Sequence, residues 1–320
     1  MRRLIVFSKL AIMIGLVYWL LDSGQIDLTQ LLEQPFSSLH VVGIIVIIGN
    51  FMLTGYRWFL LLRVQLPDVR ALRVIKWGWI GEFFNMVTPG GGGGELARSY
   101  YAIKHHPEAR IAAFSSVVLD RLIGLVALLA LGFVSYGMLV LTGRQMTPVT
   151  HYLGSASGVL LAGVVLVSAA LMMPVSRRLF RRFISHDLAQ AMALIMQTYW
   201  QRKTVAIYCF LLSLVCHLLL IFAFWIAAGI FVVQMDYLSS VLVVPLTLVA
   251  NLLPVSPGGM GVGETAATYM FAQFNVINGA GLMALVRVWM MILQLAGGLW
   301  YLFDKDGQKT PEHIVGRVQE

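Results

Sequence analysis

Long apolar runs separated by short polar segments dominate this chain. A helix needs about 20 apolar residues to cross the roughly 30 Å hydrocarbon core of a bilayer. Six runs reach that length, over residues 4–21, 39–62, 111–140, 153–174, 204–233 and 280–303. The pattern therefore predicts an all-α integral membrane protein with about six transmembrane helices.

Two shorter apolar runs, at about 74–88 and 238–256, lead into breaks rich in Gly and Pro. A short helix-like segment follows each break, at 96–104 and 265–274. Non-helical backbone survives at membrane depth only where protein or water satisfies its polar groups. We therefore expect two re-entrant hairpins, which leave the membrane on the side they entered and cover residues 74–104 and 238–276.

The two breaks have related sequences. Pro89–Glu95 and Pro257–Glu264 share the order Pro-Gly-Gly, further glycine and then glutamate, and a span with buried charge follows each. The unit of span, broken hairpin and charged span thus occurs twice. We expect one membrane domain, 1–320, divided into a first helix and outer loop (1–38), repeat 1 (39–140), a connecting helix with a basic segment (141–203), repeat 2 (204–303) and a tail (304–320).

Composition and charge placement give the orientation. The chain is 59% hydrophobic and 12% charged, whereas soluble domains carry about 25% charged residues. The net charge of +8 is better explained by where the basic residues lie relative to the membrane than by nucleic-acid binding. With both termini in the cytoplasm, the outer loops hold a single basic residue, Arg144, as the positive-inside rule requires. The first hairpin then opens to the cytoplasm and the second to the outside, which defines an inverted repeat.

The basic segment 176–203 has two interpretations. Its paired arginines precede an apolar-patterned stretch, Leu188–Tyr199. An amphipathic helix on anionic lipid would show this pattern. An ordinary cytoplasmic anchor would also show it, and we favour the anchor.

The hairpins supply the candidate binding groups. Each second half-helix begins near the bilayer centre, where its free N–H groups and positive dipole end suit an anion such as a phosphate. Glycine allows the turn and a close approach, and arginine suits phosphate. The candidate substrate-binding residues are Asn85, Gly90, Gly91, Gly92, Glu95, Arg98, Asp120, Arg121, Asn251, Gly258, Gly259, Gly261, Glu264 and Arg287.

Several of these residues have a structural alternative. Glu95 and Glu264 fall in the first turn of their half-helices, where a carboxylate complements the dipole or forms an ion pair; proton coupling and substrate contact stay open. Asn85 and Asn251 suit interhelical hydrogen bonds as well as a headgroup. Arg287 has no acidic residue in its own span, so Glu264 or Glu95 is its expected partner.

Other charges on the spans are expected to be structural. Asp120 and Arg121 would chiefly neutralise charge in the span, with one of the two reaching to the other hairpin. Arg57 lies near a span end, and we expect it to extend to the cytoplasmic interface. Glu82, in the first half-helix, stays unassigned.

Three motifs together resemble the membrane region of lysylphosphatidylglycerol synthases. They are Pro89–Arg98, Asp120-Arg121-x-x-Gly124 and Pro257–Glu264, and the resemblance covers about residues 5–305. It implies a domain of the bacterial cytoplasmic membrane with two re-entrant hairpins, proposed to move lipids with polar or charged headgroups between leaflets. Few residues follow the last span, so we expect neither the soluble aminoacyl-transferase domain nor lysyl transfer.

The expected function is transbilayer flipping of a phosphate-bearing lipid, such as a phospholipid or a polyprenyl-phosphate-linked glycan, without a cofactor or metal. The expected partners are anionic or phosphate-bearing lipids, and a lipid- or glycan-modifying enzyme is a further candidate. Two alternatives stay open. One is a membrane-embedded enzyme that uses Glu95 or Glu264 as a base on a lipid phosphate, and the other is a scaffold subunit of a lipid-synthesis complex.

Overall fold

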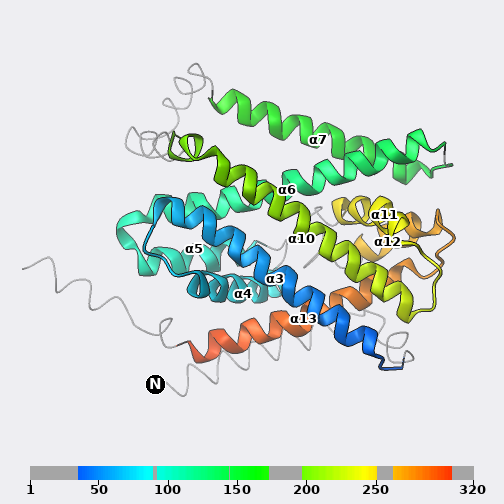
Figure 1. The fold of residues 1–320 in the computed structure, drawn as a ribbon, viewed down its shortest axis with the longest axis horizontal. Coiled ribbons are helices and arrows are strands. Elements are labelled where there is room, and N and C mark those ends of the chain that lie inside the picture. Colours follow the sequence, from blue (N-terminus) through cyan, green and yellow to red (C-terminus); the bar gives the residue numbers. More distant parts are fainter. Residues whose placement is uncertain (1–34, 89–91, 144, 173–196, 251–261, 305–320) are drawn as a thin grey trace, which may run out of the picture.

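The chain folds as a helical bundle (Figure 1). The computed structural model describes residues 35–88, 92–143, 145–172, 197–250 and 262–304, and no β-strand occurs in these ranges. The helices are α3 (Ser38–Gln65), α4 (Ala71–Val87), α5 (Gly93–His105), the short 3-10 helix η2 (Pro107–Ala109), α6 (Arg110–Leu141), α7 (Pro148–Met172), α10 (Lys203–Ile230), α11 (Tyr237–Ala250), α12 (Val262–Ala272) and α13 (Gly279–Phe303).

Five helices are long and apolar enough to cross a membrane. They are α3, α6, α7, α10 and α13, and they match the runs predicted at 39–62, 111–140, 153–174, 204–233 and 280–303. The run at 4–21 lies outside the described residues, as does most of the basic segment 176–203. The chain is therefore an all-α, multi-pass membrane protein.

The two Gly/Pro-broken regions form pairs of shorter helices. In the first pair, α4 has 17 residues and α5 has 13. In the second, α11 has 14 residues, with Pro245 inside it, and α12 has 11. Helices α5 and α12 each begin three residues before the predicted 96 and 265. Part of each glycine-rich break is thus helical.

Helix contacts in one half of the molecule have counterparts in the other. Helices α3, α4, α5 and α6 of the first unit correspond in order to α10, α11, α12 and α13 of the second. The contact between α3 and α4 corresponds to that between α10 and α11, and the contact between α4 and α13 corresponds to that between α11 and α6. The contacts α5–α6, α3–α6 and α3–α13 likewise correspond to α12–α13, α10–α13 and α10–α6, while α3 packs directly on α10. The two units therefore pack in equivalent ways.

Equivalent helices of the two units run in opposite directions. In Figure 1 the sequence colours show α3 antiparallel to α10, and α6 antiparallel to α13. The pair α4–α5 lies toward one end of the long axis, and α11–α12 lies toward the other.

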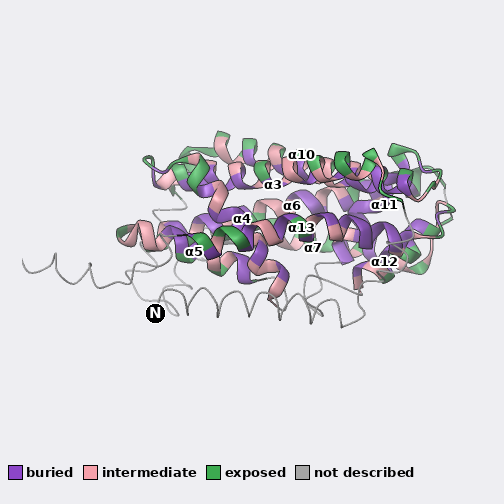
Figure 2. Ribbon diagram, turned by 90° about the horizontal axis from the view of Figure 1, so that it is seen from below, coloured by how far each residue is buried: buried purple, intermediate pink, exposed green. Residues whose placement is uncertain are grey.

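Buried residues lie mainly where these helices face one another, and exposed residues lie on their outer faces (Figure 2). The exposed residues include many large hydrophobic ones. One core cluster joins α3–α6 around Trp58 and Trp77, and a larger one around Phe224 and Trp289 joins α10–α13 to buried residues of α3, α4, α6 and α7. Apolar outer faces are the expected surface of a protein whose solvent is lipid.

Candidate functional site

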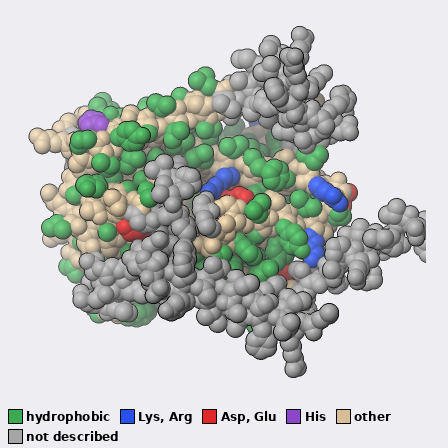
Figure 3. Space-filling view, turned by 180° about the vertical axis from the view of Figure 1, so that it is seen from behind, with side chains coloured by type: hydrophobic (Ala, Val, Ile, Leu, Met, Phe, Trp, Pro, Cys, Tyr) green, Lys and Arg blue, Asp and Glu red, His purple; other side chains and the backbone are tan. Residues whose placement is uncertain are grey.

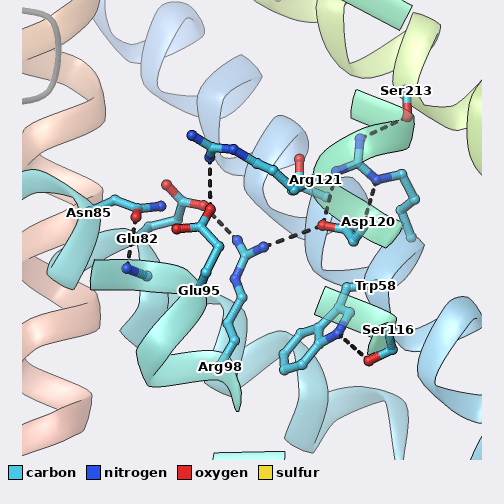
Figure 4. A network of polar contacts seen from close by, with 12 residues as sticks. Trp58, Glu82, Asn85, Glu95, Arg98, Ser116, Asp120, Arg121 and Ser213 are labelled. Carbon is cyan, nitrogen blue, oxygen red and sulfur yellow. Dashed lines mark hydrogen bonds and ion pairs between the residues drawn. The ribbon is translucent and has the colours of Figure 1, made fainter. Parts of the chain in front are cut away.

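A chain of ion pairs runs through the centre of the first unit (Figure 4). Arg98 on α5 donates through Nη2 to Glu82 Oε1 on α4 at 2.7 Å and through Nη1 to Asp120 Oδ2 on α6 at 3.3 Å. Its guanidinium also lies over the Trp58 ring, 5.7 Å from the centroid. Arg98 therefore connects both helices of the first pair to α6.

Arg57 continues this chain to the second unit. Its Nε and Nη2 donate to Asp120 Oδ1 at 2.7 Å and Oδ2 at 3.1 Å, and its Nη1 donates to Ser213 Oγ on α10 at 2.7 Å. Arg57 is 7% exposed and Asp120 is 1% exposed. The expectation that Arg57 extends to the interface is therefore wrong, because the buried carboxylate of Asp120 supplies its counter-charge.

These buried charges lie well inside the long helices. Asp120 is about 15 Å along α6 from its first residue, and Arg57 is about 12 Å from the end of α3, at a helical rise of about 1.5 Å per residue. Charges at such positions are expensive to bury and need partners. We call Arg57, Glu82, Arg98 and Asp120 the buried cluster.

A second ion pair lies beside the buried cluster and reaches the surface. Arg121 Nη1 is 2.8 Å from Glu95 Oε1, and the Arg121 side chain is 59% exposed. Asp120 and Arg121 point in different directions from α6, the first into the buried cluster and the second toward α5 (Figure 4). On one face of the molecule, charged side chains of both signs emerge among hydrophobic ones (Figure 3).

The second unit contains an ion pair of the same kind. Arg287 Nε on α13 donates to Glu264 Oε1 at 2.9 Å, and Nη2 donates to Oε2 at 3.4 Å. Glu95 and Glu264 are each the third residue of their helix, and each pairs with an arginine of the long helix that follows. The expected Glu264–Arg287 pairing is confirmed. The expected bond from Asp120 or Arg121 to the other hairpin is wrong in the described residues, since the ion-pair partners found there, Arg57, Arg98 and Glu95, all come from the first unit.

The charged groups differ between the two units beyond this shared pair. The residue three positions after Glu95 is Arg98, whereas three positions after Glu264 it is Ala267. The residue before Arg121 is Asp120, whereas before Arg287 it is Val286. Ala267 and Val286 are both buried. The first unit therefore places charge where the second places apolar core.

Glycine and asparagine hold the first helix pair together. The Asn85 side-chain oxygen accepts a hydrogen bond from the Gly94 backbone N–H at 2.8 Å. A Cβ added at Gly93 would meet Thr88, and one added at Gly94 would meet Asn85. Gly92, at the start of α5, has open space around it. Asn85 thus links α4 to α5, in agreement with the interhelical hydrogen bond predicted for it as the alternative to a headgroup contact.

Several sequence-predicted residues cannot be placed. Six of them lie outside the described residues: Gly90, Gly91, Asn251, Gly258, Gly259 and Gly261. Among the residues that the structure describes, no three His, Cys, Asp or Glu side chains lie together as a metal site.

Three contributors to the site were not predicted as such: Arg57, Glu82 and Ser213. The sequence carries one signal for them, which is the position of Asp120 in the middle of an apolar run. A carboxylate there requires donors from neighbouring helices, and Arg57 is the one arginine in the preceding span. The partner Ser213 has no such signal.

Fold and site together define a multi-pass helical membrane protein with two related units and buried ion pairs. The sequence matches the lysylphosphatidylglycerol synthase TM region family over residues 6–298, and the chain belongs to this family. UPF0104 membrane protein MJ1595 of Methanocaldococcus jannaschii is 23% identical over 238 residues, which cover 69% of this chain and 70% of that protein. No solved structure matches the chain.

Proposed function

We propose that this protein moves a lipid with a phosphate-bearing or charged headgroup from one leaflet to the other. In this proposal α4–α5 and α11–α12 are re-entrant hairpins of an inverted repeat, and the headgroup binds between them at mid-membrane. Transporter sites typically form where two inverted repeats bring discontinuous helices together.

The repeated Glu–Arg pair is the observation that carries the proposal. Glu95–Arg121 and Glu264–Arg287 are ion pairs between the first turn of a short helix and the following long helix. The two short helices belong to pairs at opposite ends of the bundle (Figure 1). Charged groups inside a membrane are costly, and their usual use is in a substrate or ion pathway.

The headgroup would exchange partners with these pairs. Arg121 and Arg287 offer planar forks of N–H donors that match a phosphate, and the first N–H groups of α5 and α12 add the positive ends of two helix dipoles. The acyl chains stay in the bilayer, and the lipid leaves chemically unchanged. We further propose a bacterial cytoplasmic membrane location with cytoplasmic termini, and a lipid- or glycan-modifying enzyme as a partner.

Purified protein in liposomes tests this function. Fluorescent headgroup-labelled phosphatidylglycerol, placed in the inner leaflet, should become accessible to an external quencher faster than in protein-free liposomes. Mass spectrometry of the recovered lipid should find it unmodified. A modified lipid would support the enzyme alternative, and no movement of any labelled phospholipid would contradict the transporter.

A further inference from the structure

The two carboxylate oxygens of Glu95 have different surroundings. Oε1 contacts Arg121 Nη1 at 2.8 Å. Oε2 is buried and has no hydrogen-bond partner among the described residues. A buried carboxylate oxygen without a donor is unusual, because desolvation removes the water that would otherwise stabilise it. Glu95 therefore depends on one contact, and that contact is with a largely exposed arginine.

Among the residues that the structure describes, no second cation beside Glu95 is available to replace Arg121. The charged groups near it from the packed helices are Glu82 on α4, Arg98 on its own helix, and Asp120 and Arg121 on α6 (Figure 4). Arg98 bonds Glu82 and Asp120, and Asp120 also holds Arg57. The buried cluster is thus neutral by itself, with two arginines and two carboxylates.

Binding of a phosphate at Arg121 changes the charge balance at Glu95. The exposed guanidinium of Arg121 is the one that a headgroup reaches first, and a phosphodiester brings one negative charge to it. Arg121 then neutralises the phosphate, and the Glu95 carboxylate is left without a counter-charge. A carboxylate in that position becomes neutral by protonation instead of staying charged.

We propose that Glu95 takes up one proton when a phosphodiester headgroup binds Arg121, so that the lipid anion and the proton bind together. This inference rests on the proposed function, because it uses the same headgroup site. The proton comes from water and converts the carboxylate to a carboxylic acid, which can donate a hydrogen bond to a phosphate oxygen. Headgroup and proton then carry no net charge, so the membrane potential does not oppose their movement.

Binding measured against pH tests the proposal in the purified full-length protein. The probe is dihexanoylphosphatidylglycerol, a soluble phosphodiester that keeps its single charge between about pH 5 and 8. Linkage of one proton to binding weakens the affinity by about tenfold for each pH unit of increase, where Glu95 is charged in the free protein. A pH indicator in weak buffer should record the uptake of one proton for each lipid bound.

Glu95→Gln removes the titrating group and keeps its shape. This variant should bind the probe with an affinity that does not change with pH, and with no proton uptake. Glu108→Gln is the matched control and should keep the proton uptake, because the Glu108 side chain is 70% exposed and pairs with His106, outside the site. Unchanged proton uptake in Glu95→Gln would overturn the proposal.

The remaining outcomes separate this inference from the proposed function. Binding by the wild type without proton uptake overturns the proton linkage alone, while absence of binding overturns both. Dimethyl phosphate carries the same diester without acyl chains. Proton uptake with both probes supports linkage to the phosphate group in general, and uptake with the lipid alone supports linkage to a headgroup held by its chains.

Discussion

Asp120 is the residue on which the charge balance of the first unit depends. Its two oxygens hold both Arg57 and Arg98, and it is 1% exposed. Asp120→Asn would leave two buried guanidinium groups with one carboxylate, Glu82. Removing one partner of a buried ion pair destabilises a protein by about 3–5 kcal/mol. We expect a loss of this size, measured by thermal or denaturant unfolding in detergent.

Glu108→Gln is the control for Asp120→Asn, because its exposed pair with His106 should contribute no more than about 1 kcal/mol. The double variant Arg57→Met with Asp120→Leu removes opposite charges together. It should be more stable than Asp120→Asn, since Arg98 keeps Glu82. Wild-type stability in Asp120→Asn would contradict the role given to the buried cluster.

Residue partners could be predicted only where the sequence leaves few choices. Arg287 has no acid in its own span, so Glu264 was one of two expected partners, and the prediction is confirmed. Arg57 was wrongly assigned to the interface because its distance from the span end permits a long side chain to extend there. Its real partner comes from a helix 63 residues away in sequence, and no local pattern encodes that contact.

At the scale of elements, substitutions in the first helix pair test why glycine is present near its turn. Gly94→Ala places a Cβ against Asn85, whereas a Cβ at Gly92 meets nothing within 4 Å. We expect Gly94→Ala to destabilise the protein by about 1–3 kcal/mol, as overpacking does, and Gly92→Ala to change its stability little. Unfolding of the two variants in parallel measures the difference. Equal stability would contradict the close packing of α5 on α4.

The spans were predictable because about 20 apolar residues in a row have few other stable structures in water or lipid. The starts of α5 and α12 were predicted three residues late because glycine has a low intrinsic helix propensity. At Gly93 and Gly94 packing against Thr88 and Asn85 outweighs that propensity. The bond from Asn85 to Gly94 holds the first turn of α5 in place.

At the scale of the whole molecule, the two ends of α6 allow the predicted orientation to be tested. Arg110 begins this helix and Thr142 follows its end, so a transmembrane α6 places them on opposite sides. Cysteine at Arg110 should react with an impermeant maleimide only from the cytoplasm, and cysteine at Thr142 only from outside. The native Cys209 and Cys216 are buried, and a variant without either serves as the background. Labelling of both positions from one side would contradict the topology.

The equivalent packing of the two units places each short helix pair against the other unit. Helix α4 packs on α13 of the other unit, and α11 packs on α6, so each hairpin lies in contact with the helix that carries the other unit's arginine. We therefore expect a change at one helix pair to alter the surroundings of both Glu–Arg pairs. The order of the contacts was not predictable from the sequence, because the two repeats share motif spacing but few core residues.

The central claim is that the two arginines of the Glu–Arg pairs bind the headgroup during transport. Measuring lipid transport by variants of these arginines tests it most directly. Arg121→Ala and Arg287→Ala should each slow phosphatidylglycerol movement in liposomes by at least about tenfold, the loss expected when charge-assisted hydrogen bonds are removed. Arg110→Ala, an exposed arginine at the start of α6, is the matched control and should transport as the wild type does. Wild-type transport by correctly folded Arg121→Ala and Arg287→Ala proteins would contradict the account.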